Sequence, residues 1–122
     1  GKVSRLGKLH FVHGDIVLRN GATVNPARTL VNAYRKNIRA GHLHTYSAAI
    51  DTTLVDAKDF HSGIIVPALS TRNPAFIKNN PNCFCQGFLY GYVYPNGNFS
   101  DTVVIINNGI FTANGKIYDG NK

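Results

Sequence analysis

The chain has 122 residues, 43% of them hydrophobic and 16% charged, and 13 Lys and Arg against 6 acidic residues give a formal net charge of +7. This composition indicates one folded domain over residues 1–122 and excludes a disordered chain. No apolar run approaches the roughly 18–20 residues of a membrane helix, so we expect no membrane partner. The chain begins at Gly1 without a methionine or signal peptide, and we expect a mature or trimmed protein.

The positive charge is concentrated in the N-terminal third. Residues 1–40 hold eight of the basic residues but only one acid, Asp15, and therefore carry all of the net charge. Such a field attracts phosphate or an acidic protein surface, or forms a solvated face. All six acids are Asp. A mechanism with Glu as general base is therefore excluded, and only Asp or His can take that role.

Residues 9–18 are predicted to form a strand or strand pair with a bend at Gly14. A helix is predicted over about 26–40, because Asn25 is a suitable N-cap, Pro26 suits the first turn and Gly41 suits the end. Apolar residues at helical spacing form its buried stripe: Ala27, Leu30, Val31, Tyr34 and Ile38.

Three arginines, Arg28, Arg35 and Arg39, are predicted on the opposite helix face. Two explanations stay open for them. They form a surface that binds phosphate, or they stabilise the helix by their position near its C-terminus.

Apolar runs and period-two patterns predict strands at about 43–50, 62–69, 86–94 and 101–113, with a last one at 116–118. Asn- and Gly-rich turns separate the later strands, and 70–82 is predicted to be a long loop. One helix followed by such strands indicates an α+β fold, with the helix packed on an antiparallel sheet.

His42 and His44 are predicted on one face of the strand that follows the helix. They form an acid–base pair, two ligands of a metal ion, or an ordinary exposed pair. Cys83 and Cys85 are too close in sequence for an unstrained disulfide with each other and give only a weak metal signal.

Tyr90, Tyr92 and Tyr94 alternate along one predicted strand and therefore share a face. They stack on nucleic-acid bases or pack across the sheet. The chain contains no nucleotide-binding or nucleophile-elbow motif, and we expect no cofactor.

The layout resembles the small fungal guanyl-specific ribonucleases, which have a short hairpin, one helix and an antiparallel sheet. The likeness covers roughly residues 10–110. It rests on His-Leu-His-Thr-Tyr at 42–46, Ile-Val-Pro-Ala-Leu at 65–69, and the hairpin from Gly91 to Ile105.

Carried over residue by residue, this resemblance implies an inactive site. The first catalytic histidine falls on His44. The catalytic Glu falls on Ile65, the Arg falls at Tyr90 or Gly91, and the general-acid His falls near Ile105. Three of the four roles are unfilled, so the resemblance implies a pseudoenzyme with a vestigial His44.

A basic, inactive domain of this kind resembles the secreted ribonuclease-like effectors of cereal powdery mildew fungi. Tyr-Arg-Lys at 34–36 and His-Thr-Tyr at 44–46 carry the likeness, whereas the usual opening cysteine is absent from Phe-Val-His at 11–13. The resemblance implies secretion by the fungus and action in the host cell cytoplasm. It further implies suppression of immunity through a host plant protein or RNA, and recognition as an avirulence protein by an intracellular leucine-rich-repeat receptor.

We expect contacts with RNA or a partner protein on the helix arginines, at the vestigial site, on the tyrosine face and in the long loop. The residues are Arg28, Arg35, Arg39, His42, His44, Tyr46, Arg72, Lys78, Tyr90 and Tyr92. The alternatives are an RNA-binding module and a residual ribonuclease that uses His42 and His44. No metal ligand set is assigned.

Overall fold

The computed structural model describes residues 2–14, 25–52, 60–69 and 84–121. These residues form one helix and nine strands. The elements are β1 (Ser4–Leu6), β2 (Leu9–Val12), α1 (Pro26–Tyr34), β3 (Asn37–Ala40), β4 (Ser47–Thr52), β5 (Phe60–Ile65), β6 (Gln86–Val93), β7 (Phe99–Ile106), β8 (Ile110–Ala113) and β9 (Lys116–Asp119).

The predicted α+β class is confirmed, but the predicted antiparallel sheet is wrong. The main sheet, sheet A, has the order β1-β2-β3-β5-β4. Strand β3 pairs in parallel with both β2 and β5, whereas β1 and β4 pair antiparallel with their neighbours. The link through α1 places β2 and β3 side by side in the same direction, as a helical crossover between parallel strands does.

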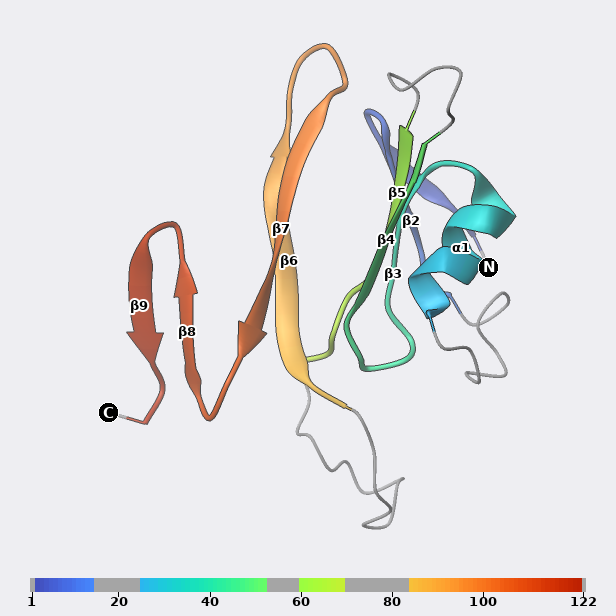
Figure 1. Cartoon of the computed structure of the whole chain (residues 1–122). Helices are drawn as coiled ribbons and strands as arrows, with labels where there is room; N and C mark the ends of the chain where they lie inside the picture. The colour runs from blue at the N-terminus through green and yellow to red at the C-terminus, as the bar shows by residue number, and fades with distance from the viewer. Residues whose placement is uncertain (1, 15–24, 53–59, 70–83, 122) are drawn as a thin grey trace.

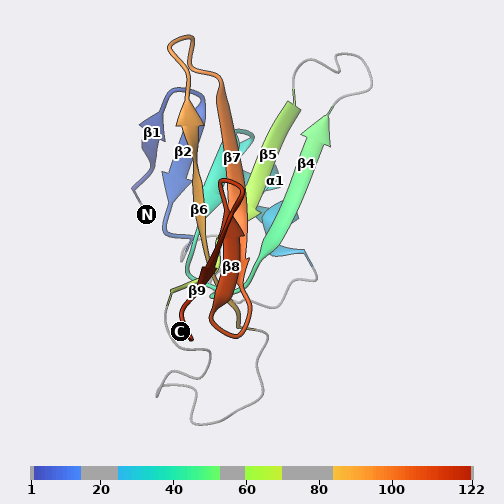
Figure 2. The same cartoon turned by 90° about the vertical axis from the view of Figure 1, so that its left-hand side faces the viewer.

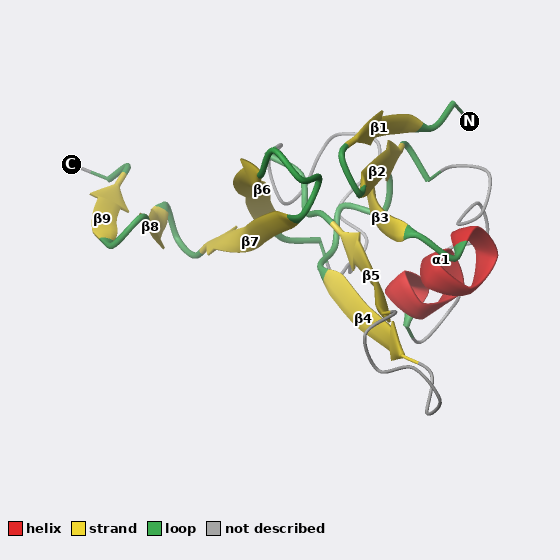
Figure 3. Ribbon diagram, turned by 90° about the horizontal axis from the view of Figure 1, so that it is seen from above, coloured by secondary structure: helices red, strands yellow, loops and turns green. Residues whose placement is uncertain are grey.

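The elements form layers. Helix α1 covers one face of sheet A, the β6–β7 hairpin covers the other, and the β8–β9 hairpin lies farther out (Figure 1, Figure 3). Viewed from the outer side, β8–β9 lies in front of β6–β7 (Figure 2). Sheet A is therefore buried on both faces near its centre.

The helix begins as predicted and ends earlier. The Asn25 side chain accepts a hydrogen bond from the Arg28 N–H at 3.2 Å, and Pro26 occupies the first turn. Arg35 adopts a left-handed conformation with φ 53° and donates its N–H to the Val31 carbonyl, which ends the helix at Tyr34. The predicted extension to residue 40 is wrong because residues 37–40 pair with two strands of sheet A.

The core lies between α1 and sheet A. Its buried residues come from the helix and from β2, β3, β4 and β5: Val12, Ala27, Leu30, Val31, Ile38, Ala40, Ala49 and Ile65. Gly63 of β5 faces the helix, and a methyl group there would overlap Val31. Close helix–sheet packing therefore requires glycine at this position.

The strand boundaries also differ from the prediction. Predicted strand 9–18 contains β2, and its residues 15–18 lie outside the described part. Segment 43–50 enters β4 only at Ser47, and 62–69 corresponds to β5, which starts at Phe60 and stops before Pro67, a residue without an N–H. Segment 86–94 matches β6. Segment 101–113 covers β8 and most of β7, which begins earlier, at Phe99, and the two strands are separate. The final strand at 116–118 is confirmed as β9.

Candidate functional site

Two histidines lie where two neighbouring parallel strands end. His13 directly follows β2, and His42 lies two residues after β3. The carboxyl ends of parallel strands meet at one sheet edge, which is where open sheets of this kind place their ligands. We call this edge the histidine edge, defined by His13, His42 and His44.

The rings of His13 and His42 are in contact. His42 Nδ1 lies 3.2 Å from His13 Nε2, and the ring centroids are 5.0 Å apart at an interplanar angle of 69°. Two nitrogens that share one zinc ion at a tetrahedral angle lie roughly 3.3–3.4 Å apart, given Zn–N distances of about 2.0–2.1 Å. The observed separation suits a shared metal ion as well as a direct hydrogen bond.

The backbone that carries His42 is unusual. His42 has φ 75° and His44 has φ 60°, and the Leu43 N–H donates to the Gly41 carbonyl at 2.9 Å. A hydrogen bond from residue i+2 to residue i around a positive φ defines the rare, strained form of the γ-turn. Strained conformations of this kind cost about 1–3 kcal/mol each and cluster at functional sites. The prediction that both histidines face one side of a strand is wrong, because they lie in the loop between β3 and β4.

His44 is held at the start of β6. Its carbonyl accepts the Cys85 N–H at 2.9 Å, and its ring lies 4.9 Å from the Phe84 ring. Leu43 between the histidines packs against the core. The loop between β3 and β4 is thus held by the contacts of His44 with residues 84–85 and by the packing of Leu43 on the core. Cys85 is a free, half-buried cysteine, and Cys83 lies outside the described residues.

The described residues contain no group of three or more His, Cys, Asp or Glu side chains arranged for a metal ion. His13 and His42 thus bring two imidazole nitrogens together, and no third such side chain of the described residues joins them. Catalytic zinc sites hold the ion with three protein ligands and a water, so an ion at this pair would need one further ligand.

Arg28 and Arg35 lie together, but both face an acid. Asp51 of β4 lies 3.7 Å from Arg28 and 3.4 Å from Arg35, and both arginines are solvent-exposed. Arg28 also donates to the Ile50 carbonyl at 3.0 Å. Part of the charge predicted on this face is therefore neutralised within the chain.

The predicted placement of Arg39 on the exposed face of the helix is wrong. Arg39 lies on β3, only 3% exposed, and its guanidinium pairs with Asp101 of β7 at 2.6 Å and 3.1 Å. Since alternate residues of a strand point to opposite faces, Ile38 and Ala40 face α1 while Arg39 faces the β6–β7 hairpin.

The predicted tyrosines lie away from the histidine edge or in solvent. Tyr90 is near Phe88, and its hydroxyl accepts the Asn114 N–H at 3.2 Å, which connects β6 to the β8–β9 turn. Tyr46 and Tyr92 are exposed. Arg72 and Lys78 lie outside the described residues.

His13 was not among the site residues predicted from the sequence. The signal available was a repeated local pattern: an apolar strand end, then histidine next to glycine, at residues 12–14 and again at 40–42. The pattern marks two strands that end in the same way at one sheet edge.

Among the described segments, no helix has the length and apolar character to cross a membrane. Comparisons with protein-family models, curated proteins and solved structures each found no match.

Proposed function

We propose that His13 and His42 bind one divalent transition-metal ion, and that this ion supports hydrolysis of a phosphate ester. The observation that carries the proposal is the 3.2 Å separation of the two ring nitrogens at the ends of parallel strands. Imidazole is a common ligand for zinc and neighbouring metals.

The chemistry follows from the ligand type and the charge. A metal ion held by these imidazoles would lower the pKa of bound water and polarise a phosphoryl oxygen. The chain as a whole has a formal net charge of +7, which favours an anionic substrate. The chain has no Glu, so a carboxylate base of that type is not available, and the metal ion would supply the activation of water instead.

The binding test uses protein stripped with a chelator and titrated with Co²⁺ and Zn²⁺. Co²⁺ gives a visible absorption spectrum that reports nitrogen ligands, and calorimetry gives the affinity for Zn²⁺. We expect His13→Ala and His42→Ala each to lose most of the affinity, whereas His61→Ala, at the other end of sheet A, keeps it. Equal affinity in all three variants would contradict the proposed ligands.

The activity test measures hydrolysis of bis(p-nitrophenyl) phosphate and of single-stranded RNA with added metal and with chelator. Cleavage that needs both the metal and His42 supports the proposal. Cleavage that survives the chelator and is lost in His44→Ala supports the residual ribonuclease. Metal binding without hydrolysis of either substrate would overturn the proposed activity and leave the metal site.

The effector function implied by the ribonuclease resemblance stays a prediction. That resemblance implied an antiparallel sheet, whereas sheet A is mixed. The proposed function is therefore argued from the histidine edge alone.

A further inference from the structure

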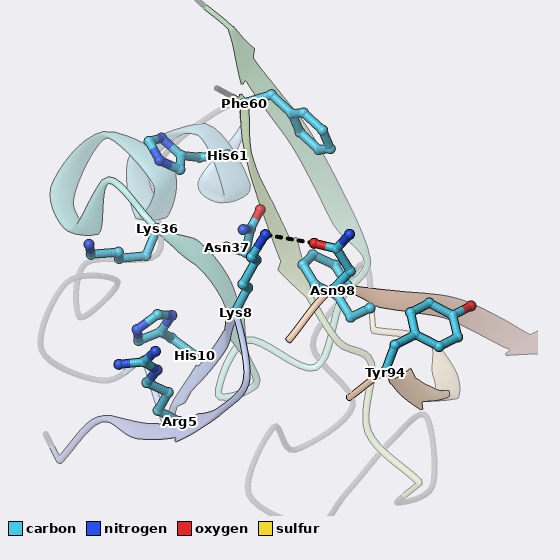
Figure 4. A pocket seen from close by; sticks show the side chains of 10 residues that line it. Arg5, Lys8, His10, Lys36, Asn37, Phe60, His61, Tyr94 and Asn98 are labelled. Atoms are coloured by element: carbon cyan, nitrogen blue, oxygen red, sulfur yellow. Dashed lines mark hydrogen bonds between the residues drawn. The ribbon is translucent and has the colours of Figure 1, made fainter. Parts of the chain in front are cut away.

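A cavity lies at the end of sheet A that is opposite the histidine edge. It has a volume of about 670 Å³ and is located where β2, β3 and β5 begin, beside the end of the β6–β7 hairpin. Volumes of 300–1,000 Å³ are typical of cavities that take a small ligand. We call it the basic pocket, and its lining side chains are drawn in Figure 4.

One side of the basic pocket is cationic. Arg5, His10, Lys36 and His61 gather there, and Lys8 extends across the middle (Figure 4). Among the described lining residues there is no carboxylate. The described ion pairs of the chain occupy other arginines, so Arg5, Lys8 and Lys36 line the cavity without a described acid as partner.

The cations are partly ordered by the chain itself. Arg5 Nε donates to the Gly7 carbonyl at 2.8 Å, and Lys8 Nζ donates to Asn98 Oδ1 at 2.7 Å. The Lys8 N–H also donates to the Gly97 carbonyl, which connects the β1–β2 turn to the β6–β7 turn. Lys36 makes no hydrogen bond or ion pair with any described residue. Its ammonium group is available to a ligand.

The other side of the pocket is aromatic. Phe60 and Tyr94 flank Asn98 on the side away from Arg5 and Lys36 (Figure 4), and Phe99 completes the lining. Phe60 is 48% exposed and Tyr94 is 47% exposed. Exposed rings next to cations are the combination that binds nucleotides, since bases stack on aromatic faces and phosphates pair with Lys and Arg.

We propose that the basic pocket binds a nucleotide, with its phosphate on Arg5, Lys8 and Lys36 and its base against Phe60 or Tyr94. The volume accommodates one nucleotide, either free or as one unit of a single strand. The site is independent of the proposed metal ion, because the four residues of β3 separate the two ends by about 13 Å.

The experiment measures binding by fluorescence anisotropy and uses two probes, a fluorescent ATP analogue and a labelled single-stranded oligo(dT). Unlabelled AMP, ATP and inorganic phosphate serve as competitors. Displacement by AMP together with tight binding of the ATP analogue indicates a free nucleotide. Tight binding of oligo(dT) that mononucleotides displace weakly indicates a nucleotide within a strand. A protein that binds neither probe at low salt overturns the proposal.

Charge variants separate the pocket from general attraction to a basic protein. We expect Arg5→Gln and Lys36→Gln each to weaken binding about tenfold, since each removes a charge-assisted contact. Lys116→Gln on β9 removes the same charge far from the pocket and is expected to leave affinity unchanged. Equal losses in Lys36→Gln and Lys116→Gln would overturn the assignment.

Aromatic variants test the stacking side. Tyr94→Ala is expected to weaken binding at least about fivefold. Tyr92→Ala is the matched control, because Tyr92 is exposed near the end of β6, two residues before Tyr94, and does not line the pocket. Identical affinities of the two variants would show that the base does not stack at Tyr94. Circular dichroism spectra of all variants establish that each one is folded.

Discussion

Removing the Asp101 carboxylate tests what holds the β6–β7 hairpin on sheet A. All five N–H donors of Arg39 are used: two bonds reach Asp101, two reach Ser62 and one reaches the Ile38 carbonyl. The Arg39 and Asp101 side chains are 3% and 8% exposed, and the Phe99 ring lies 5.4 Å from the guanidinium carbon. The pair is therefore almost fully withdrawn from water.

Asp101→Ala leaves the arginine buried with two donors unpaired. Two charge-assisted hydrogen bonds contribute about 3–6 kcal/mol at 1.5–3 kcal/mol each, and breaking a buried pair by removing one partner costs about 3–5 kcal/mol. We expect a loss of about 3–5 kcal/mol from a total stability of about 5–15 kcal/mol. With a urea m value of about 1.5 kcal/mol/M, the unfolding midpoint falls by about 2–3 M.

The assay is urea unfolding followed by circular dichroism, with Asp51→Ala as the matched control. Asp51 also faces two arginines, but Arg35 is 69% exposed, so its loss is expected to cost less than about 1 kcal/mol. The double variant Arg39→Met/Asp101→Leu is expected to recover most of the loss, since no unpaired charge stays buried. A loss below about 1 kcal/mol in Asp101→Ala would refute the reasoning.

Two further predictions concern the helix and its packing on sheet A. Arg35→Gly is expected to raise the stability by about 0.5–1 kcal/mol, because glycine adopts the left-handed cap conformation without strain, and thermal unfolding measures it. Gly63→Ala is expected to lower the stability by about 1–3 kcal/mol because the new methyl group overlaps Val31, and an unchanged urea midpoint would contradict this packing.

The parts of the fold that depend on neighbouring residues could be predicted from the sequence. Asn25-Pro26 marks the helix start, and the turns at 95–98, 107–109 and 114–115 separate the strands where expected. Each of these signals is local, because a cap or a tight turn needs specific backbone angles at one or two positions.

The parts that depend on distant pairing could not be predicted in the same way. Residues 37–40 satisfy a helical pattern, yet they form a central strand because β2 and β5 complete their hydrogen bonds on both sides. This pairing buries Ile38 and sets Arg39 against β7. Tertiary pairing overrode local propensity here.

Only part of the histidine edge could be predicted from the sequence. The sequence predicts a pair formed by His42 and His44, which are close in the chain. In the structure His42 instead contacts His13, which is 29 residues away in sequence. Their meeting depends on the parallel register of β2 and β3 and on the positive φ of His42, neither of which a single sequence displays.

The position of β5 in sheet A has a consequence for the order of folding. Strand β5 is the last of the five strands in the chain, yet it lies between β3 and β4. During synthesis, β3 and β4 therefore each expose an unpaired edge until residues 60–65 have emerged and inserted between them. Open edges of this kind pair with other chains. A nascent chain halted before Phe60 therefore exposes the edge of β3 to such pairing, and the arrival of the six-residue strand β5 covers that edge.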